Sequence, residues 1–433
     1  MTQATAAVPA PYVRSRLSVM MFLQYATWGA WLPILYAYLS GHLKFTGEQI
    51  GYCFSAGAIG AIFGPFIAGQ LADRTFATQK LLGVSHLVGA GLVYAMGVTS
   101  DFNAFLALSA VYGFVYAPTM ALTNSLAFAH LPNRDQDFGP VRVWGTVGWI
   151  AVGITVGQVL FRYHTPAGVG ADEVTAAQNA GRAVAFQVSA AIGAVMGLYC
   201  FTLPDTPPSR NAKQNTAWLE ALGEVFRMPL VVLFLVAVPV SIIHQFYFVQ
   251  ADGFIGSVQA KVTEKTWFDN AISQVFGVGG GLMTIGQMTE ILVLFAMPFL
   301  TKVLSRKQLL LVGLLAYAAR MALWAFMPTL PFVIAGIALH GLCFGCFIFV
   351  AFMIVDENTT SDVRATAQNL FNLVIVGIGT IVGSIFAANI VGGWASQGGS
   401  MDYQKLFSVP MWMALGCFGL TLLAYPSKKS APG

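Results

Sequence analysis

Three ionisable residues lie inside long apolar runs, where a charged side chain is costly. Glu290 lies in TIGQMTEILVLFAMPFL, Arg320 in LLAYAARMALWAF and His340 in AGIALHGLCFGCFIF. A carboxylate in the middle of a bilayer faces the protein interior and marks an ion or proton path, and a histidine titrates near neutral pH. We therefore expect a proton switch in which Arg320 holds Glu290 ionised and His340 relays protons. The alternative is structural, with a protonated carboxyl group and a histidine hydrogen-bonded to neighbouring helices.

A further ionisable group, Arg142, lies near the start of an apolar run in the stretch DFGPVRVWGTVGWIAVGITVG. Arg142, Thr146 and Trp149 are spaced i, i+4, i+7, so they share one helical face. A guanidinium offers paired hydrogen bonds and an indole offers a stacking surface, which together suit a hydroxylated ring compound. The alternative is that Arg142 snorkels to the nearby headgroups. Close packing of this helix inside the protein is favoured by its glycines, which are Gly145, Gly148, Gly153 and Gly157.

Amide and aromatic side chains on other apolar runs extend this predicted site. An amide offers both a donor and an acceptor to a neutral, hydroxyl-rich substrate. The candidates are Gln24 and Trp28, four residues apart in the first run, Gln245 in IIHQFYFVQ, Gln287 one turn before the deep carboxylate, and Phe344 one turn after the deep histidine. Aromatic stripes are also common packing features, so core packing remains an alternative for each.

The composition is that of a polytopic membrane protein. The chain has 433 residues, of which 57% are apolar and 9% charged, against about 25% charged in soluble domains; the mean hydropathy is +0.70. Of the 18 acidic residues, we place only Glu290 well inside an apolar run. The five cysteines all lie in apolar runs and are expected to pack, not to bind metal or form disulfides. Motifs of nucleotide binding and hydrolysis are absent from the sequence, so we expect neither an enzyme nor a cofactor.

Twelve apolar runs are long enough to span a membrane, which takes about 20 residues. They are 17–40, 47–72, 80–99, 103–130, 138–162, 183–203, 229–253, 274–301, 308–327, 329–355, 364–392 and 405–425. The stretch between the sixth and seventh is polar and proline-containing. We therefore predict an all-α protein with an N-terminal six-helix bundle (1–203), a linker (204–228) and a C-terminal six-helix bundle (229–433).

The two predicted halves resemble each other weakly and share an orientation. Gly64-Pro65-Phe66 near the end of the second run is matched by Met297-Pro298-Phe299 near the end of the eighth. Such internal repeats build many transporters, with the substrate site between them near mid-membrane. Lysine and arginine concentrate in the even-numbered loops and both termini, so we expect both termini in the cytoplasm.

The loop after the second run carries a short gating motif. In GQLADRTFATQK, Gly69, Asp73 and Arg74 fit the G-x-x-x-D-R pattern found at this place in the major facilitator superfamily. An acid and a base at a helix–loop junction can pair with charges and helix ends of neighbouring spans. The predicted fold is therefore the major facilitator fold, and these three residues are its expected cytoplasmic gate.

Several segments resemble the bacterial nucleoside:proton symporter family within that superfamily. They are FLQYATWGAWL, LKFTGEQIG, PVRVWGTVGWI, IGQMTEILVLF and VRATAQNLF. The resemblance implies that substrate binds Arg142, Thr146, Gln245, Gln287, Glu290, His340 and Phe344. At two positions the chain departs from the family, with Trp149 in place of a phenylalanine and Gly345 in place of an aspartate. His340 stands where the family has a tyrosine.

A more distant similarity connects the chain with lactose permease. FGPVRVWGTVGW is similar to the permease segment whose Arg and Trp bind sugar, and the order of Glu290, Arg320 and His340 matches three permease residues. The expected function is proton-coupled uptake of a nucleoside by a monomeric, multi-pass protein of the bacterial inner membrane, driven by the proton gradient. The alternatives are a proton-coupled sugar or oligosaccharide symporter and an uncoupled nucleoside uniporter.

Overall fold

Helices that follow the predicted apolar runs make up almost all of the described structure. The computed structural model describes residues 10–74, 76–207, 223–262, 266–360, 364–397 and 400–426. Within these residues, ten helices are long and apolar enough to cross a membrane. The other two predicted spans, 17–40 and 47–72, coincide with α1 followed by α2, and with α3. The prediction of an all-helical membrane protein is confirmed.

The long helices of the N-terminal group alternate in direction. They are α1 (Ala10–Gly29), α3 (Gly47–Arg74), α4 (Thr78–Val98), α5 (Phe102–His130), α6 (Arg134–Tyr163) and α8 (Ala183–Cys200). We call the side at which α1 begins the terminus side and the opposite side the far side. Short far-side elements connect these helices; they are the 3₁₀ turn η1 (Leu32–Ile34), α2 (Leu35–Ala37), the π-helical η2 (Tyr38–His42) and α7 (Ala171–Gly181).

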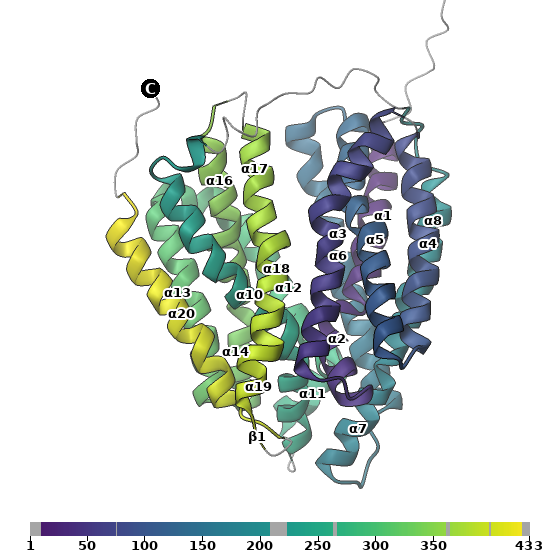
Figure 1. Cartoon of the computed structure of the whole chain (residues 1–433), viewed down its shortest axis with the longest axis vertical. Coiled ribbons are helices and arrows are strands. Elements are labelled where there is room, and N and C mark those ends of the chain that lie inside the picture. Colours follow the sequence, from purple (N-terminus) through teal and green to yellow (C-terminus); the bar gives the residue numbers. More distant parts are fainter. Residues whose placement is uncertain are drawn as a thin grey trace, which may run out of the picture.

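The C-terminal group stands beside the first, and α20 ends on the terminus side (Figure 1). Its continuous helices are α10 (Leu230–Lys261), α12 (Gly280–Val303), α13 (Arg306–Phe326) and α20 (Tyr403–Ala424). Two further spans are divided into segments. The first consists of α14 (Leu330–Ala338), α15 (His340–Leu342), the π-helical η3 (Cys343–Phe349) and α16 (Val350–Glu357). The second consists of α17 (Arg364–Asn372), the π-helical η4 (Leu373–Ile378), α18 (Gly379–Ile385), the π-helical η5 (Phe386–Ile390) and α19 (Val391–Ala395).

The far-side loops of the C-terminal group are short and capped. Helix α11 (Trp267–Phe276) begins with a capping box, in which Thr266 and Asp269 bond each other's backbone N–H. Strand β1 (Ser396–Gln397) pairs antiparallel with β2 (Ser400–Met401). Asp402 then caps α20 by accepting the backbone N–H of Lys405, and this bond holds the pKa of the Asp402 carboxyl below its usual range.

Glycines let α6 approach helices of both groups. A Cβ at Gly148 would lie 2.2 Å from the carbonyl oxygen of Phe22 on α1. A Cβ at Gly157 would lie 2.5 Å from the carbonyl oxygen of Phe276 and 2.8 Å from Cα of Gly281 at the start of α12. The two groups of helices therefore meet closely on the far side, and the glycines that the sequence singled out are contact points.

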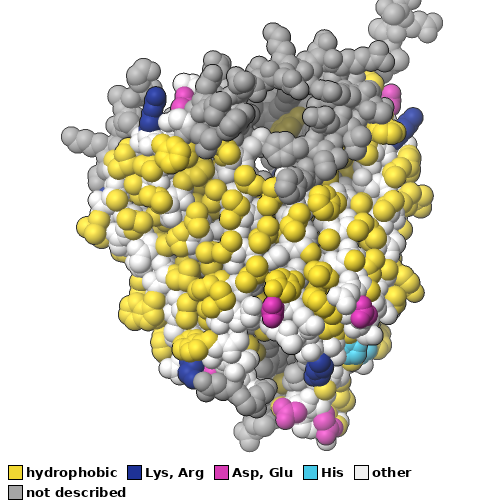
Figure 2. All heavy atoms as spheres, in the orientation of Figure 1, with side chains coloured by type: hydrophobic (Ala, Val, Ile, Leu, Met, Phe, Trp, Pro, Cys, Tyr) yellow, Lys and Arg dark blue, Asp and Glu magenta, His cyan; other side chains and the backbone are white. Residues whose placement is uncertain are grey.

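An apolar band crosses the face of the molecule that is shown in Figure 2. On the face shown in Figure 2, apolar side chains cover the middle, and charged side chains lie toward the two ends. This distribution suits a protein embedded in a bilayer, because a charged side chain on the lipid-facing surface is costly.

Two predictions fall partly on residues that the structure does not describe. The side chains of Gly69, Asp73 and Arg74, at the end of α3, lie outside the described residues, so the gating prediction remains untested. Residues 208–222 of the predicted linker also lie outside them, and the bundle boundaries remain predictions.

One sequence-based expectation is wrong. We placed every acid except Glu290 in a loop, a terminus or the end of an apolar run. Asp252 lies within α10 and is only 1% exposed. Its charge is paired with a buried arginine from the N-terminal group, Arg182, and pairing is what makes a buried charge tolerable.

Candidate functional site

Arg142 points into the protein and not toward the headgroups. Its guanidinium carbon lies 3.9 Å from the centre of the Tyr25 ring on α1, a cation–π geometry that fixes the plane of the guanidinium. Gly145 lies one turn after Arg142 on α6 and leaves room for the contact between Arg142 and Tyr25. A Cβ at Gly145 would lie 2.6 Å from the Tyr25 ring and 2.8 Å from Arg142 Nη1. Arg142 also lies within electrostatic range of Glu290 on α12.

Trp149 joins the two groups of helices through aromatic contacts. Its ring centre lies 6.0 Å from that of Trp28 on α1 and 6.5 Å from that of Phe248 on α10, both edge to face. Thr146, one turn before it on α6, is half-buried. Trp28 therefore lies against Trp149, and these aromatic contacts connect both halves.

His340 lies between Glu290 and Arg320. His340 Nε2 is 3.8 Å from a Glu290 carboxylate oxygen, and His340 Nδ1 is 3.1 Å from Arg320 Nη1. Because a guanidinium only donates hydrogen bonds, Nδ1 accepts, and the proton of the neutral ring sits on Nε2, facing the carboxylate. We expected Arg320 to hold Glu290 ionised directly. Among the described residues no ion pair joins Arg320 to Glu290, and the His340 imidazole lies between them.

Arg320 is buried among aromatic rings. It is fully buried on α13, and its guanidinium carbon lies 4.8 Å from the Tyr247 ring centre and 5.1 Å from that of Tyr317. Nε and Nη2 have no hydrogen-bond partner within the described part of the chain. The rings supply the electrostatic compensation that a buried cation needs in the absence of a directly bound acid.

Two glutamines of the predicted site, Gln245 and Gln287, differ in whether their side chains are hydrogen-bonded. Gln245 on α10 donates to Thr380 Oγ1 on α18 at 3.2 Å. Gln287 on α12 is 6% exposed, and its side-chain oxygen has no partner among the residues described. An unpaired buried acceptor is costly, so Gln287 offers a ready position for a donor group such as a substrate hydroxyl.

Gln24 and Phe344 are placed differently from the other candidates. Gln24 is fully buried within the N-terminal group; its nitrogen donates to Thr119 Oγ1 at 2.7 Å and its oxygen lies 2.7 Å from His86 Nε2. Both ends of the amide are therefore used in joining α1 to α5 and α4, and the structure does not bring it to the Trp149 platform. Phe344 is half-buried in η3, one turn after His340.

His244, which is not among the predicted site residues, lies next to His340. Its Nδ1 lies 2.8 Å from the Tyr317 hydroxyl, and its ring stacks on His340 with centres 5.5 Å apart. The Phe248 ring lies 5.2 Å away on its other side. The four-residue spacing of His244 and Phe248 on one helical face was the signal that could have connected it to the site.

The position where the resembling family has an aspartate is closed by packing. A Cβ at Gly345 would lie 2.5 Å from Val293 Cγ1 on α12. A side chain at this position would therefore require Val293 to shift. Within the described residues, no group of three or more His, Cys, Asp or Glu side chains is arranged to hold a metal ion.

Comparison with known proteins gives a consistent result. A family model described as nucleoside H⁺ symporter matches residues 12–429. YegT of Escherichia coli is 32% identical over 428 residues, covering 95% of this chain and 91% of YegT. The nucleoside permease NupG of Escherichia coli is 26% identical and covers 92% of both chains. The crystal structure of the nucleoside transporter NupG superposes with a TM-score of 0.79 at 23% identity, covering 96% of this chain and 100% of that one.

Proposed function

The chain belongs to the nucleoside H⁺ symporter family of the major facilitator superfamily, and on that premise we propose that it takes up nucleosides together with protons by alternating access. The family and the major facilitator fold agree with the sequence-based prediction. The observation that carries the assignment to a site is that Trp149 of one half contacts Phe248 of the other, which in turn contacts His340 beside Glu290.

The substrate is held by groups of both halves. The ring of a base or ribose stacks against Trp149 and Phe248, and Arg142, held flat on Tyr25, donates paired hydrogen bonds. Thr146 adds a hydroxyl on the same face of α6. Ribose hydroxyls donate to the unpaired oxygen of Gln287. Gln245, Glu290 and Phe344 complete the proposed contacts.

The proton path uses the residues around His340. Glu290 is the proposed proton carrier, because its carboxylate is the acid nearest to the substrate groups and contacts Nε2 of His340. When Glu290 is protonated, the acid is neutral and the loaded carrier can reorient; release of that proton on the other side regenerates the carboxylate. Arg320 anchors the acceptor side of the imidazole and so keeps the Nε2 proton facing Glu290.

The state in the structure has the far side closed, as the contacts of Gly157 with Phe276 and Gly281 indicate. We place the terminus side in the cytoplasm on the distribution of lysine and arginine, so the far side is extracytoplasmic. The protein is then a monomer of the bacterial inner membrane, with Gly69, Asp73 and Arg74 as its cytoplasmic gate and residues 204–228 as its linker.

A sugar or oligosaccharide substrate is the second candidate. Trp149 favours it, because an indole stacks well on the apolar face of a hexose ring. An uncoupled nucleoside uniporter is the third, because the chain has Gly345 where the resembling family has an acid.

The assignment is tested by uptake into liposomes that contain the purified protein. Labelled uridine, adenosine, maltose and lactose are compared with and without an inside-alkaline pH gradient. We expect the gradient to drive accumulation of at least one nucleoside above its external concentration, and no accumulation of the sugars. Uptake of sugars alone would overturn the nucleoside assignment, and nucleoside equilibration without accumulation would identify the uniporter.

A further inference from the structure

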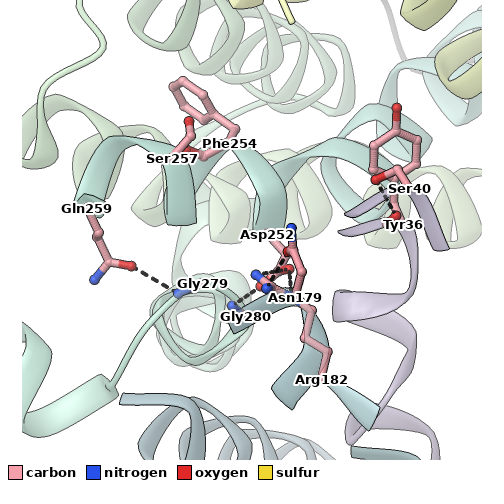
Figure 3. Close-up of polar contacts among 10 residues, drawn as sticks. All are labelled: Tyr36, Ser40, Asn179, Arg182, Asp252, Phe254, Ser257, Gln259, Gly279 and Gly280. Atoms are coloured by element: carbon pink, nitrogen blue, oxygen red, sulfur yellow. Dashed lines mark hydrogen bonds and ion pairs between the residues drawn. The ribbon is translucent and has the colours of Figure 1, made fainter. Parts of the chain in front are cut away.

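We infer that Arg182 and Asp252 form a latch that holds the far side closed and positions the helix bearing Gln287 and Glu290. Arg182 lies at the junction of α7 and α8 in the N-terminal group, and Asp252 lies in α10 of the C-terminal group. Arg182 Nε and Nη2 both lie 2.8 Å from Asp252 Oδ2 (Figure 3). The side chains are 2% and 1% exposed, so this is a desolvated ion pair between the two moving halves.

The second carboxylate oxygen of Asp252 binds the start of α12. Asp252 Oδ1 accepts the backbone N–H of Gly280, the first residue of that helix. A carboxylate is favourable at a helix N-terminus, where backbone N–H groups are unpaired and the helix dipole is positive. The Asp252 side chain therefore connects α10 to α12 and to the N-terminal group. Helix α12 carries Gln287 and Glu290 farther along its length.

The backbone around the latch is shaped to admit the carboxylate. Gly279 has a φ of +56°, and a Cβ there would lie 2.2 Å from Asp252 Oδ1. Gln259 accepts the Gly279 N–H at 2.9 Å, and Asn179 accepts from Arg182 Nη1 at 2.8 Å (Figure 3). Every polar group of the pair thus has a partner in the closed state, which is the condition for a buried ion pair to be tolerated.

Separating the two charges and neutralising one of them have different effects on the stability of the closed state. When the far side opens, the halves part and both charges pass into water, so desolvation is recovered as the attraction is lost. The intact pair can therefore open and close. If one partner is neutralised, the other charge stays buried and unpaired in the closed state only. Neutralising one residue should then favour the open far side, and neutralising both should largely restore closure.

Cysteine labelling of the purified protein in detergent tests the latch. Val278 is buried on the far side, and its backbone N–H donates to the carbonyl of Gly157 in the other half, so Val278→Cys should react with a maleimide only when the far side opens. The five native cysteines are buried. We expect Asp252→Asn or Arg182→Gln to raise the labelling rate about tenfold, the double variant to return within about twofold of the parent, and Arg182→Lys to lie between.

The controls separate opening of the latch from misfolding. Trp267→Cys, at an 82% exposed far-side position, should label at one rate in all backgrounds, and each variant should elute as a single species in size exclusion. Single variants that leave the Val278→Cys rate unchanged, or a double variant at least as fast as the singles, would overturn the latch. The inference rests on alternating access but not on the substrate, and labelling needs none, so failure of the nucleoside assignment leaves this test intact.

Discussion

At the scale of single residues, the chemistry of the site depends on how two cations are held. The Arg142 guanidinium lies against the Tyr25 ring on the face of α6 that carries Thr146 and Trp149, whereas the Arg320 guanidinium bonds His340 and is otherwise enclosed by rings. Arg142 is therefore suited to binding a ligand. Arg320 is suited to fixing the tautomer of His340, which faces Glu290.

Replacement of Glu290 by glutamine should separate binding from coupling. Glutamine retains hydrogen-bonding groups but carries no proton between sides, so we expect pH-driven accumulation to fall to the equilibrium level while substrate exchange persists. The measurement is accumulation under a pH gradient against counterflow in liposomes. Glu173→Gln, at an exposed position on α7, is the control and should behave as the parent. Coupling through Glu290 would be wrong if gradient-driven accumulation survived in Glu290→Gln.

Removal of the Tyr25 ring should weaken substrate binding through Arg142. A cation–π contact of this kind contributes about 1 kcal/mol, so Tyr25→Ala should raise KM about fivefold, whereas Tyr25→Phe, which keeps the ring, should stay within about twofold. Initial rates of uptake against substrate concentration measure this. Tyr94→Ala, at an exposed position on α4, is the matched control. Equal KM values for Tyr25→Ala and the parent would show that the ring does not position the guanidinium.

At the scale of elements, helix contacts set where the site residues stand. The span with His340 and Phe344 contains the π-helical η3, a distortion that is frequent at functional sites because it shifts the face of a helix. Gly345 in that segment packs on Val293. At this position, where the resembling family has an aspartate, the Val293 side chain of α12 occupies the space next to the glycine.

Gly148→Ala should disturb the site through the spacing of α1 and α6. The added methyl would lie 2.2 Å from the Phe22 carbonyl oxygen, so the helices must separate, and Arg142 and Tyr25 shift with them. We expect a loss of thermal stability of several degrees and at least a tenfold loss of uptake rate. Gly91→Ala, on the exposed face of α4 with no atom within 4 Å of the new methyl, should leave both near the parent values. Similar effects of the two substitutions would contradict this role of the contact.

At the scale of the whole molecule, the halves are joined by apolar contacts at the candidate site and by glycine and ionic contacts on the far side. These are the Trp149–Phe248 pair, the approach of Gly157 to Gly281, and the buried pair of Arg182 and Asp252. A transporter must break such contacts in every cycle. Contacts that include polar and charged groups suit a surface that separates repeatedly.

The orientation across the membrane is testable with the whole chain. Helices α1 and α20 begin and end on one side, where lysine and arginine concentrate in the sequence, so a fluorescent protein that matures only in the cytoplasm should be bright when fused after Gly433. Alkaline phosphatase, which is active only outside the cytoplasm, should be inactive at the same position. The reverse pattern would invert the assignment of the two sides and place the closed far side in the cytoplasm.

Much of this architecture was determined by the sequence alone. The twelve apolar runs coincide with helices because a bilayer demands about 20 apolar residues for each crossing. The deep ionisable residues Glu290, Arg320 and His340 could be identified because an apolar run has few other places for a charge. The common face of Arg142, Thr146 and Trp149 follows from helical periodicity.

The partners of these residues were decided only by the tertiary structure. The insertion of His340 between Arg320 and Glu290, the use of Gln24 inside the N-terminal group, and the pairing of Arg182 with Asp252 depend on how each helix is rotated and how closely it approaches its neighbours. Helical periodicity shows which residues share one face of a helix, but it does not show which neighbouring helix packs against that face. Contacts between residues 70 positions apart, such as Arg182 and Asp252, therefore become visible only when the helices are packed.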